Sequence, residues 1–133
     1  MTLVLDASAL AEFLVSREAG ERVAARLRED DDLHVPHLVT VEVASVLRAW
    51  LRRGEIDGAR AEGALEDLAV FPAERWPAEP VLPRMWELRE NLSAYDATYV
   101  ALAEALGADV LSADARLGRA AVDAGARCRV VSI

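Results

Sequence analysis

Lysine is absent from the chain, and all 15 basic residues are arginine. Without an amine side chain the protein cannot form a P-loop nucleotide site, which needs a lysine after a glycine-rich turn, and no such turn occurs in the sequence. The same absence argues against a phosphoacceptor receiver domain, which also carries clustered acids at strand ends but uses a lysine beside them. Any chemistry at a site must therefore rest on other side chains.

Cysteine and long apolar runs are also scarce. Cys128 is the single cysteine, so an internal disulfide is excluded, and its apolar neighbours predict a small buried filler. Hydrophobic residues make up 53% of the chain, yet no uncharged run approaches the roughly 20 residues that a membrane-spanning helix needs. The amino terminus lacks a basic signal-peptide leader. We expect a soluble, cytoplasmic protein with no membrane partner.

The length and the periodicity predict one α/β domain over residues 1–133. A chain of 133 residues can bury roughly two thirds of its unfolded surface, and no linker or repeat divides it. Apolar strands joined by helices predict a central parallel sheet of about five strands, flanked by helices on both faces. The expected strands cover residues 2–5, 33–35, a weak one near residue 70 or at 75–76, 109–112 and 128–132. The expected helices cover residues 8–15, 19–29, 41–53, 59–69, 83–90, 94–106 and 115–124, and three of them end at glycine: Gly54, Gly107 and Gly125.

Four isolated carboxylates stand in segments that otherwise read as buried. Asp6 and Asp114 each follow an apolar strand, whereas Glu42 and Asp96 lie in helices with few other charges. Burying an ionised carboxylate without compensation costs several kcal/mol or more, so four such groups predict pairing, metal binding or catalysis. Loops at the carboxyl ends of parallel strands form the ligand crevice of this class, and we expect Asp96 and the other acids to face it.

Structural explanations exist for each acid taken alone. Asp6 and Asp114 could cap the helices that follow them, Ser93 could cap the helix that carries Asp96, and Glu42 could favour the dipole of a first turn after Thr40. A second alternative is ion pairing of one or two acids with Arg48 or Arg116. Neither explains why four segments are so apolar at once, which favours convergence on one site.

The remaining polar and aromatic residues point to less specific roles. His34 and His37 lack the second histidine or cysteine cluster of a zinc site, so we interpret both as non-ligands. Trp50, Trp76 and Trp86 have apolar neighbours that indicate core or interface packing in preference to base stacking.

The acids and the net charge together indicate a cation-dependent chemistry. A formal charge of −8 by itself disfavours nucleic acid and favours a basic protein partner. However, an all-oxygen cluster suits Mg²⁺ or Mn²⁺, which would make the local field positive where a phosphate docks. Two such ions can activate a water and stabilise the leaving oxygen of a phosphodiester without a covalent nucleophile.

The segments that carry these acids resemble a known family. In order along the chain, residues 3–8, 41–48, 95–103 and 111–117 are similar to the motifs of PIN-domain proteins, and most similar to VapC-type toxin ribonucleases of bacterial type II toxin–antitoxin pairs. The resemblance implies a Mg²⁺- or Mn²⁺-dependent endoribonuclease that acts on RNA, forms a homodimer or a larger toxin–antitoxin assembly, and is held inactive by a small cognate antitoxin. We predict that the antitoxin has a basic tail that lies against the acidic groove.

By position, the metal-binding and catalytic acids would be Asp6, Glu42, Asp96 and Asp114, with Ser8 and Ser112 as small hydroxyl residues beside them.

The roles within this set are hypotheses. Asp6, Asp96 and Glu42 would bind the main ion, and Asp114 would hold a second ion or position the attacking water. Arg116 either makes a surface salt bridge, which we slightly favour, or contacts an RNA phosphate. Two alternative functions remain: a non-catalytic PIN-fold binding scaffold, which would not need four acids, and a DNA-structure nuclease, for which 133 residues leave little room.

Overall fold

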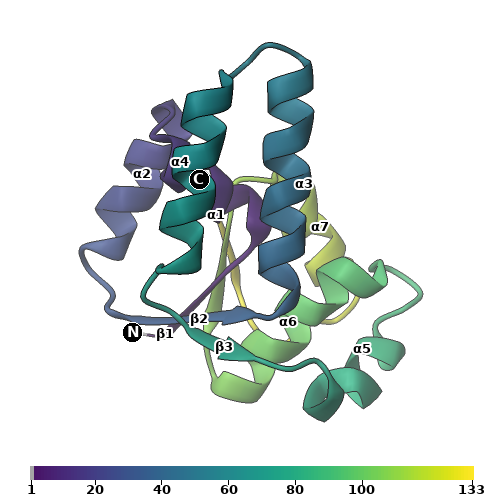
Figure 1. Ribbon diagram of the computed structural model, residues 1–133. Helices are drawn as coiled ribbons and strands as arrows, with labels where there is room; N and C mark the ends of the chain where they lie inside the picture. Colours follow the sequence, from purple (N-terminus) through teal and green to yellow (C-terminus); the bar gives the residue numbers. More distant parts are fainter. Residues whose placement is uncertain (1) are drawn as a thin grey trace.

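A five-stranded parallel sheet forms the centre of the computed structural model, which describes residues 2–133 (Figure 1). The strand order is β3-β2-β1-β4-β5, and every neighbouring pair is parallel. The predicted sheet is therefore confirmed, and the third strand lies at the second of the two expected places. The strands are β1 (Thr2–Leu5), β2 (Asp32–Pro36), β3 (Glu74–Trp76), β4 (Asp109–Ser112) and β5 (Val130–Ser132).

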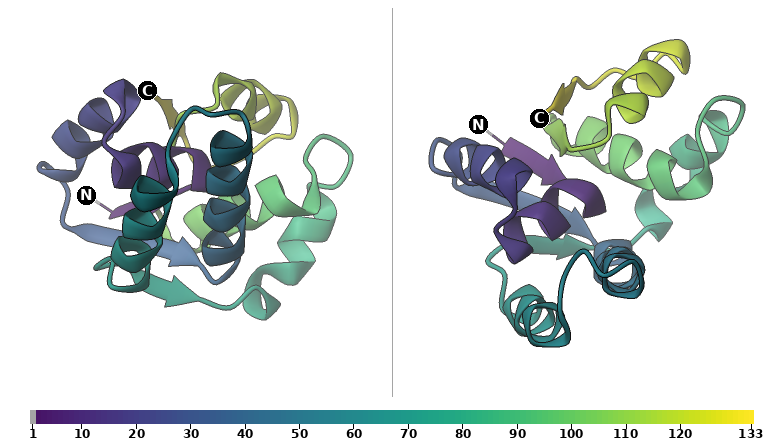
Figure 2. Two further views of the ribbon diagram at one scale, coloured as in Figure 1. Left: turned by 45° about the horizontal axis from the view of Figure 1, so that its top comes forward. Right: turned by 90° about the horizontal axis from the view of Figure 1, so that it is seen from above.

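Helices cover both faces of this sheet, as predicted (Figure 2). One face carries α1 (Ala7–Val15), α2 (Glu18–Leu27), α3 (Leu38–Arg52) and α4 (Gly58–Ala69). The other carries α5 (Leu82–Glu87), α6 (Ala94–Leu106) and α7 (Ala115–Asp123), with the short 3₁₀ turn η1 (Glu79–Val81) before α5. None of the helices within residues 2–133 is long and apolar enough to cross a membrane.

Burial explains why these segments form these elements. Leu3, Val4 and Leu5 are fully buried in β1, because a parallel strand covered on both faces needs a continuous apolar run. In α6, residues 97–103 are all buried, which accounts for a helix that is apolar nearly all round. Gly107 ends this helix in the left-handed region, with φ of 63°, as its place after the apolar run predicted.

The strand order puts a topological switch point between β1 and β4. The chain leaves β1 for α1 on one face and leaves β4 for α7 on the other, so the two connections diverge at the carboxyl ends of these strands, which is where proteins of this class bind ligands. Asp6 directly follows β1, and its backbone N–H donates to the carbonyl of Leu111 in β4 at 3.1 Å. Asp114 follows β4 two residues after Ser112. The fold therefore brings two of the four acids to one edge of the sheet.

Two local expectations were wrong. The helix expected to begin at Val41 begins at Leu38. The strand β2 ends at Pro36, and only His37 separates it from α3. The last strand begins at Val130, where its pairing with Val110 starts, so Cys128 lies in the connection before it and is only partly buried.

Candidate active site

Asp6 is the most buried of the four acids, with 6% of its surface exposed. It caps α1, since its Oδ1 accepts hydrogen bonds from the Ala9 backbone N–H at 2.9 Å and from the Ser8 hydroxyl at 2.6 Å. Burial nevertheless raises the pKa of Asp6, outweighing the lowering by hydrogen bonds from Ser112, Ser8 and Ala9, and the negative charge of Asp96 raises it further. The capping role is real, but it does not offset the cost of the buried charge.

Glu42 lies in the second turn of α3 and is partly buried. Because the helix begins at Leu38, the sequence-based alternative of a first-turn acid that favours the dipole is wrong. The carboxylate instead accepts a 2.6 Å hydrogen bond from the Tyr99 hydroxyl to Oε1. Burial raises the pKa of Glu42, the Tyr99 bond lowers it, and the charges of Asp96 and Asp6 raise it.

Asp96 lies in the first turn of α6. Ser93 caps this helix, because its Oγ accepts the Asp96 backbone N–H at 3.1 Å. The side of the turn that carries Asp96 is exposed to solvent, as is Tyr95 beside it, so the expectation that Asp96 is kept from open water is corrected: the buried part of the helix starts only at Ala97. The surrounding chain still desolvates the carboxylate enough to raise the pKa of Asp96, and the charge of Asp114 raises it further.

Asp114 differs from the other three acids because a cation already pairs with it. It caps α7 by accepting the Arg116 backbone N–H at 3.0 Å, and the Arg116 guanidinium donates to both carboxylate oxygens, at 3.2 and 3.3 Å. These contacts hold the pKa of Asp114 below its usual range. The structure thus contains the surface salt bridge that the sequence analysis favoured for Arg116, whose side chain is 84% exposed.

Ser8 and Ser112 join the two loops that carry Asp6 and Asp114. The Ser8 Oγ accepts the Ala113 backbone N–H at 2.9 Å, and the Ser112 Oγ accepts the Asp114 backbone N–H at 3.0 Å. The two hydroxyls lie 3.4 Å apart. These bonds connect the start of α1 to the β4–α7 loop across the switch point, so the serines position the loops of the site.

The four acids share one electrostatic neighbourhood. The charge of Asp96 raises the pKa of Asp6, the charges of Asp96 and Asp6 raise that of Glu42, and the charge of Asp114 raises that of Asp96. Across residues 2–133, no three His, Cys, Asp or Glu side chains are grouped closely enough to ligate a metal directly. The donor set still fits a hard divalent cation, because it consists of oxygen ligands whose desolvation and mutual repulsion a cation would offset.

Tyr99 is a site residue that the sequence analysis did not identify as one. It is 2% exposed and is the largest of the fully buried side chains, and its hydroxyl contacts Glu42 from a segment 57 residues away in the chain. Its place one turn after Asp96 in a buried helix was a usable signal, because a buried tyrosine hydroxyl almost always needs a partner.

The histidines and tryptophans lie in different surroundings. The ring of His34 is buried, accepts the indole N–H of Trp76 at Nδ1 (2.9 Å), and contacts Asp32 through Nε2. Trp50 is in the core, but Trp86 is 68% exposed, with the Arg89 guanidinium over its ring, so of the two predicted roles core packing is wrong for Trp86 and interface packing stays a prediction.

Comparison with known proteins identifies the family. A family model described as PIN domain matches residues 3–123, a span that includes all four acids. Ribonuclease VapC9 of Mycobacterium tuberculosis is 45% identical over 116 residues, which are 86% of this chain and 87% of that protein. The chain belongs to the PIN-domain family of VapC ribonucleases. The resemblance inferred from the four motifs is therefore confirmed.

Solved structures agree with this VapC-family fold. PAE2754 from Pyrobaculum aerophilum superposes with a TM-score of 0.66 at 26% identity, covering 90% of this chain and 79% of that one. FitAB bound to an IR36 DNA fragment superposes with a TM-score of 0.69 at 20% identity, covering 98% and 94% of the two chains. The second likeness concerns the fold alone.

Proposed function

We propose that this VapC-family chain is a Mg²⁺- or Mn²⁺-dependent endoribonuclease and the toxin of a toxin–antitoxin pair. Its reaction would be hydrolysis of RNA phosphodiesters by water at a site formed by Asp6, Glu42, Asp96 and Asp114. One observation carries the proposal: burial and mutual repulsion raise the pKa values of Asp6, Glu42 and Asp96 at the switch point of the sheet. Such an arrangement is unfavourable in the free protein and suits a bound cation.

The residues divide into ion-holding and positioning roles. Asp6, Asp96 and Glu42 would hold the main ion, and Asp114 would hold a second ion or orient the attacking water. When bound, Mg²⁺ or Mn²⁺ would neutralise charge on the phosphate and lower the pKa of a water molecule, so that the water can act as the nucleophile. Tyr99 fixes the carboxylate of Glu42 through its hydroxyl. The exposed Arg116 keeps Asp114 ionised, and its outer face is available to an RNA phosphate.

The deciding experiment is cleavage of end-labelled structured RNA by antitoxin-free protein in Mg²⁺, Mn²⁺ or EDTA, beside Asp96→Ala. We expect cutting with either metal, none in EDTA, and none by the variant. Equal inertness of both proteins across several RNAs would support the binding-scaffold alternative. Equal cutting by both would indicate a contaminating nuclease, and metal-dependent cutting confined to flap or branched DNA would support the DNA-structure nuclease.

A cognate antitoxin is part of the same proposal. Relatives of this chain are VapC ribonucleases, and one structural neighbour is FitAB bound to an IR36 DNA fragment. We propose that a small antitoxin inserts an Arg- or Lys-bearing tail against the acidic groove and competes with metal there, since Asp6, Glu42 and Asp96 repel one another without a cation. An adjacent small open reading frame that encodes a DNA-binding fold with such a tail would support it. We also propose a homodimer as the working unit.

Replacing Tyr99 with phenylalanine tests the positioning of Glu42. The Tyr99 hydroxyl bond lowers the pKa of Glu42, so removing it is expected to raise that pKa further. If Glu42 must be ionised to act, the acid limb of the pH–rate profile for RNA cleavage moves to higher pH, and the rate below that limb falls by about tenfold. The measurement is the rate of metal-dependent cleavage between pH 5 and 9.

Tyr95→Phe is the matched control, because Tyr95 lies in the same helix and is 60% exposed, while the hydroxyl that donates to Glu42 is that of Tyr99. Its profile should coincide with that of the wild type. A Tyr99→Phe profile that falls uniformly at every pH, with a lower unfolding temperature, would show that Tyr99 contributes packing only.

A further inference from the structure

Arg116 engages both carboxylate oxygens of Asp114, one of the four acids of the candidate site. Its backbone N–H and its Nε donate to Oδ1, at 3.0 and 3.2 Å, and its Nη2 donates to Oδ2 at 3.3 Å. An ionised carboxylate has about four lone-pair directions, and Arg116 uses three of those of Asp114. In the free protein, a cation of the chain itself therefore takes most of this carboxylate.

The charge of Arg116 also reaches a second acid of the site. Burial and the charge of Asp114 raise the pKa of Asp96, and the charge of Arg116 opposes them. No arginine within residues 2–133 is among the groups that shift the pKa of Asp6 or Glu42. Arg116 is thus placed as a counter-ion for the side of the site formed by Asp114 and Asp96.

The guanidinium of Arg116 is free to leave this position. Its side chain is 84% exposed, and an exposed ion pair is weak because water and salt compete with it. Arg116 is the second residue of α7, and its backbone N–H is held by the Asp114 cap. The side chain can therefore move away from Asp114 while the helix and its cap stay in place.

A divalent cation and this guanidinium compete for Asp114. Mg²⁺ binds carboxylate oxygens at about 2.1 Å, and the Arg116 nitrogens lie 3.2 and 3.3 Å from the same two oxygens. A cation on either oxygen would come within about 5.5 Å of the nitrogen that shares it, a separation at which like charges repel. Asp114 therefore cannot hold both cations at full strength.

We infer that Arg116 is a displaceable counter-ion, which neutralises Asp114 in the free protein and passes to an RNA phosphate when a divalent cation occupies Asp114. The inference rests on the proposed function and deepens it, because salt bridge and phosphate contact become two successive states of one side chain. The coupling is reciprocal, so the Arg116–Asp114 contact weakens metal binding as much as the metal weakens the contact.

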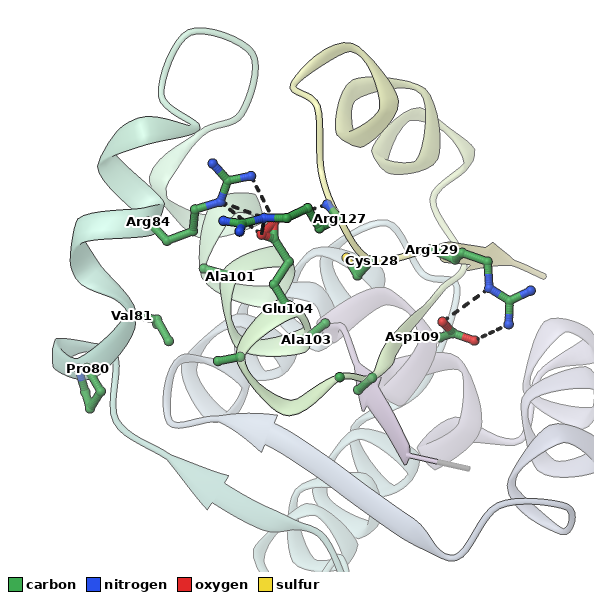
Figure 3. Close-up of a pocket in the computed structure, with 13 residues that line it drawn as sticks. Pro80, Val81, Arg84, Ala101, Ala103, Glu104, Asp109, Arg127, Cys128 and Arg129 are labelled. Atoms are coloured by element: carbon green, nitrogen blue, oxygen red, sulfur yellow. Dashed lines mark hydrogen bonds and ion pairs between the residues drawn. The ribbon is translucent and has the colours of Figure 1, made fainter.

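Arg129 and Asp109 form a similar ion pair that serves as a reference (Figure 3). Arg129 also donates through Nε and Nη2, at 3.4 and 2.7 Å, and its side chain is 73% exposed. Asp109 is the first residue of β4, at the opposite end of this strand from Asp114. The same type of contact thus occurs away from the four acids, and its loss should leave metal binding unchanged.

The test is calorimetric titration of the full chain with Mn²⁺, without RNA and at constant ionic strength. We expect Arg116→Ala to bind Mn²⁺ about twofold to fivefold more tightly than the wild type, since it removes the competing guanidinium and keeps the backbone cap. Arg129→Ala should match the wild type. Arg119→Ala measures the effect of charge alone, because Arg119 acts on Asp114 through its charge without a hydrogen bond, and its effect should be smaller.

The Asp114→Asn background separates competition at Asp114 from a general effect of charge. There the excess effect of Arg116→Ala over Arg119→Ala should disappear, because the neutral amide no longer pairs with the guanidinium. Equal Mn²⁺ affinities of Arg116→Ala and Arg119→Ala, or an excess that persists in Asp114→Asn, would overturn the inference and leave the metal site intact. No Mn²⁺ binding by any of the proteins would reject the metal site of the proposed function as well.

A second readout follows the guanidinium to RNA. In metal-dependent cleavage, Arg116→Ala should raise the KM for RNA by about threefold while it lowers the Mg²⁺ concentration that gives the half-maximal rate. Opposite signs for the two constants are expected only if one side chain serves both partners. An unchanged KM for RNA would overturn the transfer of Arg116 to the phosphate.

Discussion

Asp6→Asn is expected to reduce metal-dependent RNA cleavage by on the order of 10³-fold while the protein stays folded. The amide oxygen of asparagine can still accept from the Ala9 backbone N–H and from the Ser8 hydroxyl, so the cap of α1 is retained. Only the charge that would hold the cation is lost. The measurements are the cleavage rate at saturating Mg²⁺ and the thermal unfolding curve.

The stability of this variant provides a second, independent readout. The pKa of Asp6 is raised in the fold, so its contribution to stability is fully present below the unfolded pKa of about 3.9 and is lost as pH rises through the folded value. At pH 7 in EDTA the wild type therefore carries a cost that Asp6→Asn lacks, and the variant should be at least as stable. Asp57→Asn is the matched control, because Asp57 caps α4 through the Arg60 N–H in the same way but lies in another part of the chain. An inactive Asp6→Asn that is also clearly less stable would indicate that Asp6 is only a structural cap.

Glu104→Ala is expected to lower the free energy of unfolding by ~2–3 kcal/mol. The carboxylate is 8% exposed and accepts from Arg84 Nε, Arg84 Nη2 and the Arg127 backbone N–H. Its removal leaves Arg84 without its main partner. The figure lies below that of a fully buried pair because both arginines reach solvent. Denaturant unfolding at pH 7 measures the difference.

Glu87→Ala is the control for this change, since Glu87 approaches the same Arg84 at 3.8 Å from an exposed position, and its replacement should lower the free energy of unfolding by less than ~1 kcal/mol.

The pH dependence of the Glu104→Ala effect tests whether charge is its cause. Burial works to raise the pKa of Glu104, but the hydrogen bonds from Arg84 and Arg127 outweigh it and lower the pKa. The stabilisation by Glu104 is therefore present above the unfolded pKa of about 4.3 and is lost as pH falls through the folded value. An effect of Glu104→Ala that is equal at pH 7 and pH 3 would show that the loss is packing and not charge.

Local pattern was sufficient to predict the sheet and the place of Asp6 and Asp114. Short uninterrupted apolar runs that alternate with helices are typical of parallel strands covered on both faces, and residues directly after such strands lie at the carboxyl ends of the sheet. The first residue of α3 was harder to predict from the sequence. Val39 and Thr40 have the β-branched side chains typical of an extended segment, yet β2 ends at Pro36 and both residues belong to the helix.

The differences among the four acids could not be predicted, because they depend on contacts distant in the chain. The partner of Glu42 is Tyr99, 57 residues later, and the exposure of Asp96 depends on how far the first turn of α6 extends beyond its packed part. Sequence spacing did suggest a salt bridge between Arg116 and Asp114, since the two are neighbours in one turn. The spacing could not show that this salt bridge lowers the pKa of Asp114, whereas the pKa values of the other three acids are raised.

The serine bonds at the switch point also determine how the molecule can open. Ser8 belongs to the layer of helices on one face and Ala113 to the loop that leads to the other, and a 2.9 Å hydrogen bond joins them. Neither layer can separate from the sheet near Asp6 unless this bond and those of Ser112 break together. We therefore expect the loops that carry Asp6 and Asp114 to open together, whereas partial openings at α2, α4 or the chain ends leave both loops in place.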